Sequence, residues 1–144
     1  MVRDILRCRP RVAQSDTVFV AVGDNAARRR EAEARPDARF ATVVSLHAIV
    51  STAALYGEGT LICEGAIVQA GVRIGKHVII NAGAILTHDC TVEDYAHIAP
   101  GAVLCGGVRV GEGALVGVGV GIEPLVVVPA WSIVKRERYA IRSD

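Results

Sequence analysis

Residues 62–80 read Ile62-Cys-Glu-Gly-Ala-Ile-Val68-Gln-Ala-Gly-Val-Arg-Ile74-Gly-Lys-His-Val-Ile-Ile80, and a large apolar residue returns at every sixth position. The same period continues without a break through Val50, Tyr56, Ile62, Val68, Ile74, Ile80, Leu86, Val92, Ile98, Leu104, Val110, Val116, Ile122, Val128 and Val134. A second column, of small or β-branched residues, lies two positions earlier and runs from Ala48 to Ser132. A period of six is not the period of about 3.6 of an α-helix. It is typical of a hexapeptide-repeat β-helix, in which short parallel strands wind into a solenoid.

The repeat assigns residues 47–135 to the solenoid, and residues 1–46 form a separate, shorter unit. Within that unit, Thr17–Gly23 has the apolar pattern of a buried parallel strand. Asp24 and Asn25 offer a helix cap, Ala26–Arg35 is a charged helix, and Arg39–Val44 is a second strand. This β-α-β unit is too small to hold a core alone, so we expect it to lean on the first coil.

Composition excludes several classes of partner. The net charge is +1, which gives no electrostatic reason to expect nucleic acid or an anionic membrane as partner. No apolar run reaches transmembrane length, and the N-terminus lacks the apolar core of a signal peptide. Four cysteines without a CxxC pair indicate free thiols in a reducing, cytoplasmic setting. The charged tail, residues 136–144, is expected to cap the open end of the solenoid.

Residues about 18 apart should stack if three hexads make one turn, and the outward positions then fall on three faces. Face one carries Ile49, Ile67, Ile85, Val103 and Gly121. Face two carries Leu61, Ile79, His97, Leu115 and Ile133. Face three carries Leu55, Arg73, Thr91, Arg109 and Val127. Two apolar faces beside a mixed one predict a homotrimer in which face one meets face two of the next subunit. The alternative is that these residues satisfy β-propensity alone.

His88 stands two residues past the core residue Leu86, at a corner between two faces. Ala70 and Gly106 lie one coil away on either side, so the imidazole projects into a groove with small walls. A neutral imidazole held by a carboxylate is a good general base, and Asp89 can hold this one only if the chain turns here. A solvated corner histidine is the alternative. His47 and His77 have the pattern of ordinary surface or junction residues.

Three segments carry a resemblance to a known family. They are Asn81-Ala-Gly-Ala-Ile-Leu-Thr-His88-Asp89-Cys90, His97-Ile-Ala-Pro-Gly101-Ala102, and Cys105-Gly106 followed by Val110-Gly111. The chain from Thr17 to Lys135 resembles the sialic-acid and bacillosamine O/N-acetyltransferases, which are left-handed parallel β-helix enzymes that use acetyl-coenzyme A. The resemblance therefore implies a mainly β fold, a left-handed parallel β-helix preceded by a short β-α-β unit.

The resemblance also implies roles for individual residues. His88 matches the catalytic base and Asp89 the acidic residue that polarises it. His97 matches a second histidine near the acetyl group, and the upstream Asn81 belongs to the same substrate-binding part of the motif. The coenzyme-binding residues that it implies are Gly106 and Val118, which flank the pantetheine arm. The chain departs from the family in residues 1–16, which contain no glycine where the family has a Gly-rich loop.

The expected function is therefore that of an acetyl-CoA-dependent acetyltransferase. His88 would act at a trimer interface on the amine or hydroxyl of a small, sugar-type acceptor, without a metal. The alternative is a non-catalytic trimeric scaffold or binding module derived from such an enzyme. A β-helix zinc hydratase would need three histidine ligands, whereas only His88 and His97 are candidates.

Overall fold

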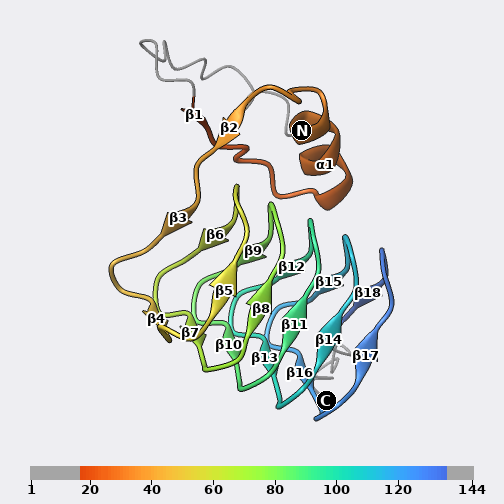
Figure 1. Ribbon diagram of the computed structural model, residues 1–144. Helices are drawn as coiled ribbons and strands as arrows, with labels where there is room; N and C mark the ends of the chain where they lie inside the picture. Colours follow the sequence, from red (N-terminus) through yellow and green to blue (C-terminus); the bar gives the residue numbers. More distant parts are fainter. Residues whose placement is uncertain (1–16, 136–144) are drawn as a thin grey trace, which may run out of the picture.

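The computed structural model describes residues 17–135, most of which form a parallel β-helix with three flat sides (Figure 1). The sheet on face one contains β4 (Ile49–Val50), β7 (Ile67–Val68), β10 (Ile85–Leu86), β13 (Val103–Leu104) and β16 (Gly121–Ile122). The sheet on face three contains β5 (Leu55–Tyr56), β8 (Arg73–Ile74), β11 (Thr91–Val92), β14 (Arg109–Val110) and β17 (Val127–Val128). The sheet on face two contains β3 (Val43–Val44), β6 (Leu61–Ile62), β9 (Ile79–Ile80), β12 (His97–Ile98), β15 (Leu115–Val116) and β18 (Ile133–Val134).

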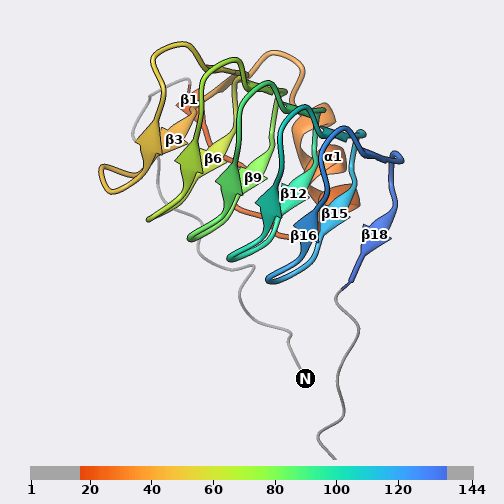
Figure 2. The same cartoon turned by 90° about the horizontal axis from the view of Figure 1, so that it is seen from below.

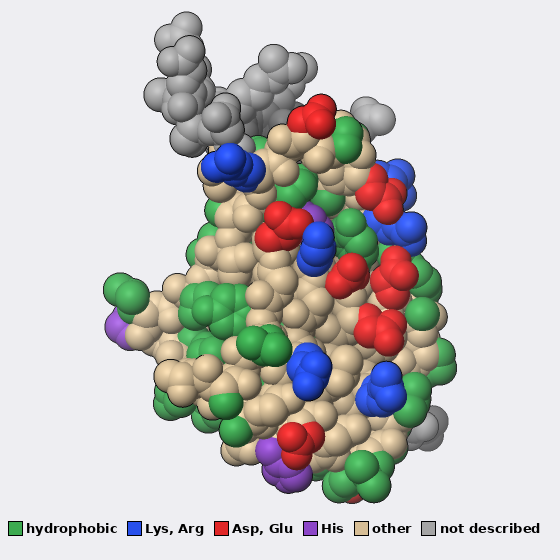
Figure 3. Space-filling view, in the orientation of Figure 1, with side chains coloured by type: hydrophobic (Ala, Val, Ile, Leu, Met, Phe, Trp, Pro, Cys, Tyr) green, Lys and Arg blue, Asp and Glu red, His purple; other side chains and the backbone are tan. Residues whose placement is uncertain are grey.

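Strands pair in parallel with the strand one coil away, which places each residue beside the one 18 positions along the chain. His97, for example, pairs with Ile79 on one side and with Leu115 on the other. The three faces inferred from the sequence are therefore the three observed sheets, and the predicted fold class is confirmed. Figure 3 looks onto face three, where charged side chains of both signs gather.

The inward columns form one continuous core. Ile62, Ile80, Leu86, Ile98 and Leu104 have no exposed surface, and small residues such as Ala66, Ala84 and Ala102 fill the gaps between them. Full burial of one such large aliphatic side chain stabilises a fold by about 1.5–3 kcal/mol. Because every coil repeats the same layer, the core extends along the whole solenoid.

Three edges connect the sheets, and each is named here by a feature that it carries. The His88 edge joins faces one and three and contains residues 51–54, 69–72, 87–90, 105–108 and 123–126. The helix edge joins faces three and two and contains residues 57–60, 75–78, 93–96, 111–114 and 129–132. The Asn81 edge joins faces two and one and contains residues 45–48, 63–66, 81–84, 99–102 and 117–120.

The N-terminal unit has shorter elements than the sequence predicts. Only β1 (Thr17–Val18) of the predicted strand Thr17–Gly23 pairs, in parallel with β2 (Arg39–Phe40). The predicted strand Arg39–Val44 divides, because β3 joins the solenoid sheet and leaves β2 with β1. The helix α1 spans Asn25–Glu33, close to the predicted Ala26–Arg35. Of the two candidate caps, Asp24 is the one that caps it: the Asp24 carboxylate accepts a hydrogen bond from Ala27 N at 2.7 Å, and Asn25 is the first helical residue.

Face two is covered in part by this same N-terminal unit, which lies across the sheet of β6, β9, β12 and β15 (Figure 2). Ile79, which points outward from that sheet, is only 8% exposed. Face two is therefore covered in part within a single chain, whereas Ile133 on the same face is 58% exposed. Part of its apolar row lies beneath residues 19–23. On face one, Ile49 is 67% exposed.

His77 is buried, which corrects its interpretation as a surface or junction residue. It lies on the helix edge, 4% exposed, with its ring stacked on Tyr95 at 5.3 Å and edge-on to Phe40 at 4.6 Å. Its Nδ1 atom has no hydrogen-bond partner among the described residues. Burial lowers the pKa of His77 below its ordinary value of 6.5, and the neighbouring Glu58 opposes this shift.

The predicted capping role of residues 136–144 concerns a segment outside the described residues. Within residues 17–135, no helix has the length and apolar character required to cross a membrane.

The core predicts a sharp contrast between two substitutions. Ile80→Asp should unfold the solenoid, because the carboxylate would be buried without a partner in a fully enclosed layer. Thr91→Asp, on face three between Arg73 and Arg109, should change the melting temperature by only a degree or two. Thermal unfolding followed by circular dichroism measures both, and equal melting temperatures would contradict the inward assignment of Ile80.

The buried His77 predicts a loss of stability in acid. Since its pKa is lower in the folded chain than in the unfolded chain, the unfolded chain binds more protons once the pH falls below about 6.5. The free energy of unfolding should therefore be largest above that pH and fall as the pH is lowered toward 5. His77→Phe, which keeps the aromatic stack, should reduce this dependence, and His47→Phe at an exposed position should not. Urea unfolding at several pH values tests the difference.

Candidate active site

His88 and Asp89 form a hydrogen-bonded pair on the His88 edge. The chain turns between β10 and β11, and Asp89 adopts a left-handed conformation with φ of 61°. That turn brings two adjacent side chains together, so that His88 Nδ1 lies 2.9 Å from Asp89 Oδ2. The side chains are 67% and 72% exposed. The turn required by the sequence argument is therefore present, and it leaves Nε2 of His88 beside Gly106 and not bonded to Asp89.

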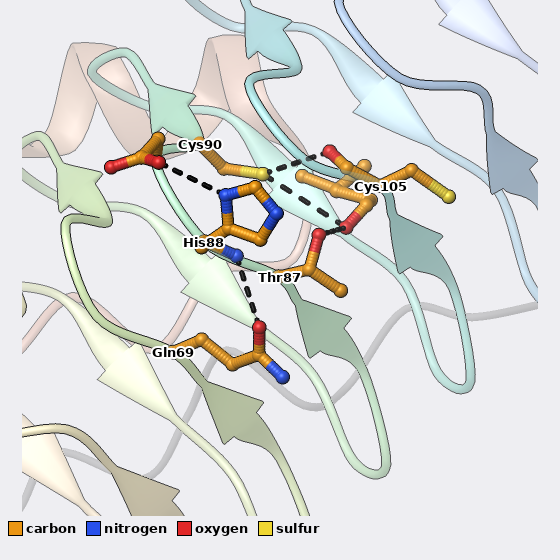
Figure 4. Close-up of polar contacts among 7 residues, drawn as sticks. Gln69, Thr87, His88, Cys90 and Cys105 are labelled. Carbon is orange, nitrogen blue, oxygen red and sulfur yellow. Dashed lines mark hydrogen bonds and ion pairs between the residues drawn. The ribbon is translucent and has the colours of Figure 1, made fainter.

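The loop that carries His88 is fixed on both sides by neighbouring coils (Figure 4). The His88 amide donates to Gln69 Oε1 at 3.1 Å, and the His88 carbonyl accepts from Gly107 N at 3.0 Å. Thr87 Oγ1 donates to the carbonyl of Leu104 at 2.9 Å. These contacts hold the backbone of His88, and the Asp89 carboxylate sets the rotation of its ring.

Two glycines make room for this pair. A Cβ atom at Gly106 would lie 2.7 Å from Cε1 and 2.8 Å from Nε2 of His88, so any side chain there would displace the imidazole. Gly71, with φ of 75°, lies beneath the Asp89 carboxylate, which a Cβ atom would also meet. Gly106 was identified from the sequence, but Gly71 and Gln69 were not. The 18-residue spacing between Gly71 and Asp89 is the signal that could have identified the first of them.

Asn81 and His97 form a second polar pair, on the Asn81 edge and face two. Asn81 Oδ1 accepts from Ala82 N at 2.8 Å, which directs its Nδ2 toward His97 Nε2 at 3.1 Å. The amide nitrogen is a donor, so Nε2 of His97 acts as the acceptor and the neutral ring carries its proton on Nδ1. Burial lowers the pKa of His97, and the positive charge of Arg28 lowers it further. His97 is therefore neutral at pH 7.

Two cavities flank His97 beneath the N-terminal unit. One, of about 250 Å³, lies between residues 19–23 and the side chains of Leu61, Ile79 and Asn81. The other, of about 200 Å³, lies between residues 23–26 and the side chains of Leu115, Trp131 and Ile133. Both have mainly apolar walls with a few polar groups, which is the usual character of a small-molecule site.

The predicted site residues fall into two groups within one chain. His88, Asp89 and Gly106 lie together on the His88 edge. That edge joins faces one and three, so it lies across the solenoid from face two, where His97 and Asn81 meet. Val118 is 67% exposed and lies on the Asn81 edge, away from Gly106. A single chain therefore does not unite the proposed base with the second histidine, and Gly106 and Val118 do not share one groove within it.

In residues 17–135, no three His, Cys, Asp or Glu side chains are grouped so as to hold a metal ion. No protein-family model matches the chain.

Solved structures do match. The acetyltransferase domain of PglB from Neisseria gonorrhoeae, in complex with acetyl coenzyme A, is 34% identical with a TM-score of 0.78, over 81% of this chain and 58% of that one. PerB from Caulobacter crescentus, in complex with CoA and GDP-perosamine, is 34% identical with a TM-score of 0.69, over 84% of this chain and 62% of that one. WeeI from Acinetobacter baumannii, 22% identical with a TM-score of 0.63 over 88% of this chain and 69% of that one, shows likeness of fold alone. The chain spans about three fifths of the length of the first two. These matches confirm the resemblance inferred from the sequence.

Proposed function

Because this chain is a hexapeptide-repeat β-helix protein whose structural neighbours are sugar N-acetyltransferases, we propose that it transfers an acetyl group from acetyl-CoA to a sugar-type acceptor. The observation that carries the proposal is the His88–Asp89 pair, with Nδ1 of the ring held at 2.9 Å from the carboxylate. An imidazole held in this way keeps its proton on Nδ1 and its lone pair on Nε2, which is the form a general base requires.

The reaction follows from that arrangement. An amine or hydroxyl of the acceptor attacks the thioester carbonyl of acetyl-CoA, while Nε2 of His88 takes its proton. The tetrahedral intermediate collapses, the C–S bond breaks, and the coenzyme A thiolate takes a proton from the imidazolium ring. Gly106 presents backbone alone beside the imidazole, so the acyl arm can approach the base along this edge. The acetylated acceptor and free coenzyme A are the products.

The role of His97 in this scheme is to position the acceptor. Its Nε2 accepts from Asn81. The oxyanion would be met by a backbone N–H group or by the remaining ring N–H of His97. His97 lines both cavities, and Asn81 lines the one beneath residues 19–23.

The full site in this proposal lies between subunits of a homotrimer. In a closed ring of three chains in which face one of each subunit meets face two of the next, the His88 edge, which borders face one, lies against face two of the neighbour. That arrangement unites the base with Asn81, His97 and Val118 of its neighbour, and places Val118 beside the acyl arm that passes Gly106. The outward row of face one, with Ile49, Ile67 and Ile85, supplies apolar surface for the contact.

The catalytic proposal predicts graded losses of activity. His88→Ala should lower kcat by about 10² to 10⁴ because the general base is removed. Asp89→Asn should cost less, since the base remains and only its tautomer and orientation change. His47→Ala, on an exposed loop, is the matched control and should have no effect. Acetyl-CoA binding by calorimetry should persist in all three variants, and a screen of nucleotide-linked amino sugars supplies the acceptor.

Two outcomes would count against this function. Full turnover by His88→Ala would remove His88 as the base. If the unaltered protein does not bind acetyl-CoA, the chain is a non-catalytic scaffold.

The trimer predicts that charge on face one breaks the assembly. The double variant Ile67→Asp, Ile85→Asp should give a folded monomer, because both side chains point outward and the carboxylates would be desolvated only in the interface. Thr91→Asp on face three should leave the trimer intact. Analytical ultracentrifugation at micromolar concentration measures the mass, and a folded monomer of the unaltered chain would contradict the prediction.

A further inference from the structure

Helix α1 carries three consecutive arginines, and their surroundings differ sharply. Arg28 is 1% exposed, although it is one of the largest side chains in the protein. Arg29 lies near the surface and pairs with Glu33 and Glu112. Arg30 is exposed. A helix that needed only a charged outer surface would not bury one of these cations, so the position of Arg28 calls for a specific explanation.

The guanidinium of Arg28 is fully used as a hydrogen-bond donor. On the N-terminal side it donates to the Val22 carbonyl at 2.9 Å, the Gly23 carbonyl at 3.2 Å and Asn25 Oδ1 at 2.8 Å. On the solenoid side it donates to the carbonyls of His77 at 2.8 Å, Tyr95 at 2.6 Å and Ala96 at 3.3 Å. One planar group therefore joins two parts of the chain that are far apart in sequence.

These partners are neutral. Within residues 17–135, no carboxylate forms an ion pair with Arg28. Burial lowers the pKa of Arg28 to about 10, although the charge of Asp24 opposes the shift, so the group is still a cation at pH 7. A lysine could not replace it, because a single ammonium group has three donors at one point.

The two sets of partners meet at His97. Tyr95 and Ala96 lead directly into β12, and the Gly23 carbonyl bound by Arg28 belongs to the loop that lines both cavities beside His97. Asn25, held by Arg28 through Oδ1, donates through Nδ2 to the carbonyls of Gly113 at 3.0 Å and Ala114 at 3.2 Å. The Ala114 carbonyl also accepts the amide of His97 at 2.9 Å.

We propose that Arg28 is a positioning residue for the acceptor side of the active site: it fixes the loop Val22–Asn25 as a roof over His97 and keeps both cavities open at a defined width. The inference rests on the proposed function for its catalytic consequence, but the contact itself belongs to the folded chain. Arg28 touches neither the proposed base nor the groove beside Gly106. Its loss should therefore affect the acceptor and leave acetyl-CoA binding unchanged.

The test compares Arg28→Met and Arg28→Lys with Arg30→Met, the same substitution two residues along the same helix. The pKa of His97 is measured in the full chain by NMR titration, with its ring signals assigned from a His97→Gln variant. In Arg28→Met the roof loosens and a nearby positive charge is lost, so the pKa of His97 should rise toward 6.5. The Val22 and Ala27 amides, which donate to the Val20 carbonyl and to Asp24 Oδ1, should exchange faster with solvent, and Arg28→Lys should show an intermediate effect on exchange. Arg30→Met should match the unaltered protein.

Kinetics add the catalytic readout, with GDP-perosamine as the acceptor probe. Arg28→Met should lose about 10²-fold in kcat/KM for the acceptor, as expected when a substrate is misplaced by about 1 Å. The Kd of acetyl-CoA by calorimetry should stay the same. If the unaltered protein does not acetylate GDP-perosamine, the proposed function loses that acceptor, while the His97 titration still decides the role of Arg28.

Three outcomes would overturn the proposal. The first is a His97 pKa and a Val22 amide exchange rate in Arg28→Met equal to those of Arg30→Met. The second is an acetyl-CoA Kd that weakens as much as kcat/KM for the acceptor. The third outcome applies if Arg28→Met unfolds the solenoid. Arg28→Lys then becomes the test, and amide exchange rates in that variant equal to those of the unaltered protein would contradict the inference.

Discussion

The structure depends on one constraint, the parallel pairing of each strand with the strand 18 residues away. Because the backbone N–H and C=O groups of the strands bond to the coils before and after, each strand residue must lie directly beside its equivalents in those coils. The same pairing fills the core with Ile62, Ile80 and Ile98 in one stack. It also limits the size of each corner side chain, because that side chain lies beside the equivalent residue one coil away. The imidazole of His88 has room because position 106 is glycine, and the Asp89 carboxylate because position 71 is glycine.

The periodic part of the chain could be predicted from the sequence because its contacts repeat. The inward columns and the membership of all three faces follow from a single spacing, and the pairings Ile67 with Ile85 and Arg73 with Thr91 agree with it. The location of His88 beside Gly106 follows from the same spacing. The contact between His88 and Asp89 does not follow from the spacing alone, because it depends on the left-handed backbone at residue 89. Aspartate adopts that conformation more readily than most residues.

The aperiodic part could not be predicted in the same way. Arg28 contacts residues 49, 67 and 68 positions away, and no repeat links α1 to those corners. An arginine inside a run of three arginines has the pattern of a solvated helix surface. For the same reason His77 was placed at the surface, since its burial depends on Phe40 from the N-terminal unit and on Tyr95 from the next coil. The cover over face two arises from the same unit, and it leaves face one as the more open apolar side.

The three edges of the solenoid have a consequence for how such a chain can change its length. Insertion or loss of 18 residues would add or remove one whole coil, and every residue beyond it would keep its edge. A change of six would keep the inward columns in place and leave the core intact, yet it would move everything that follows by one edge, so that Gly106 would no longer lie beside the His88 imidazole. The fold therefore tolerates length changes in steps of six, whereas the chemistry tolerates only steps of 18 that fall outside the segment between His88 and Gly106.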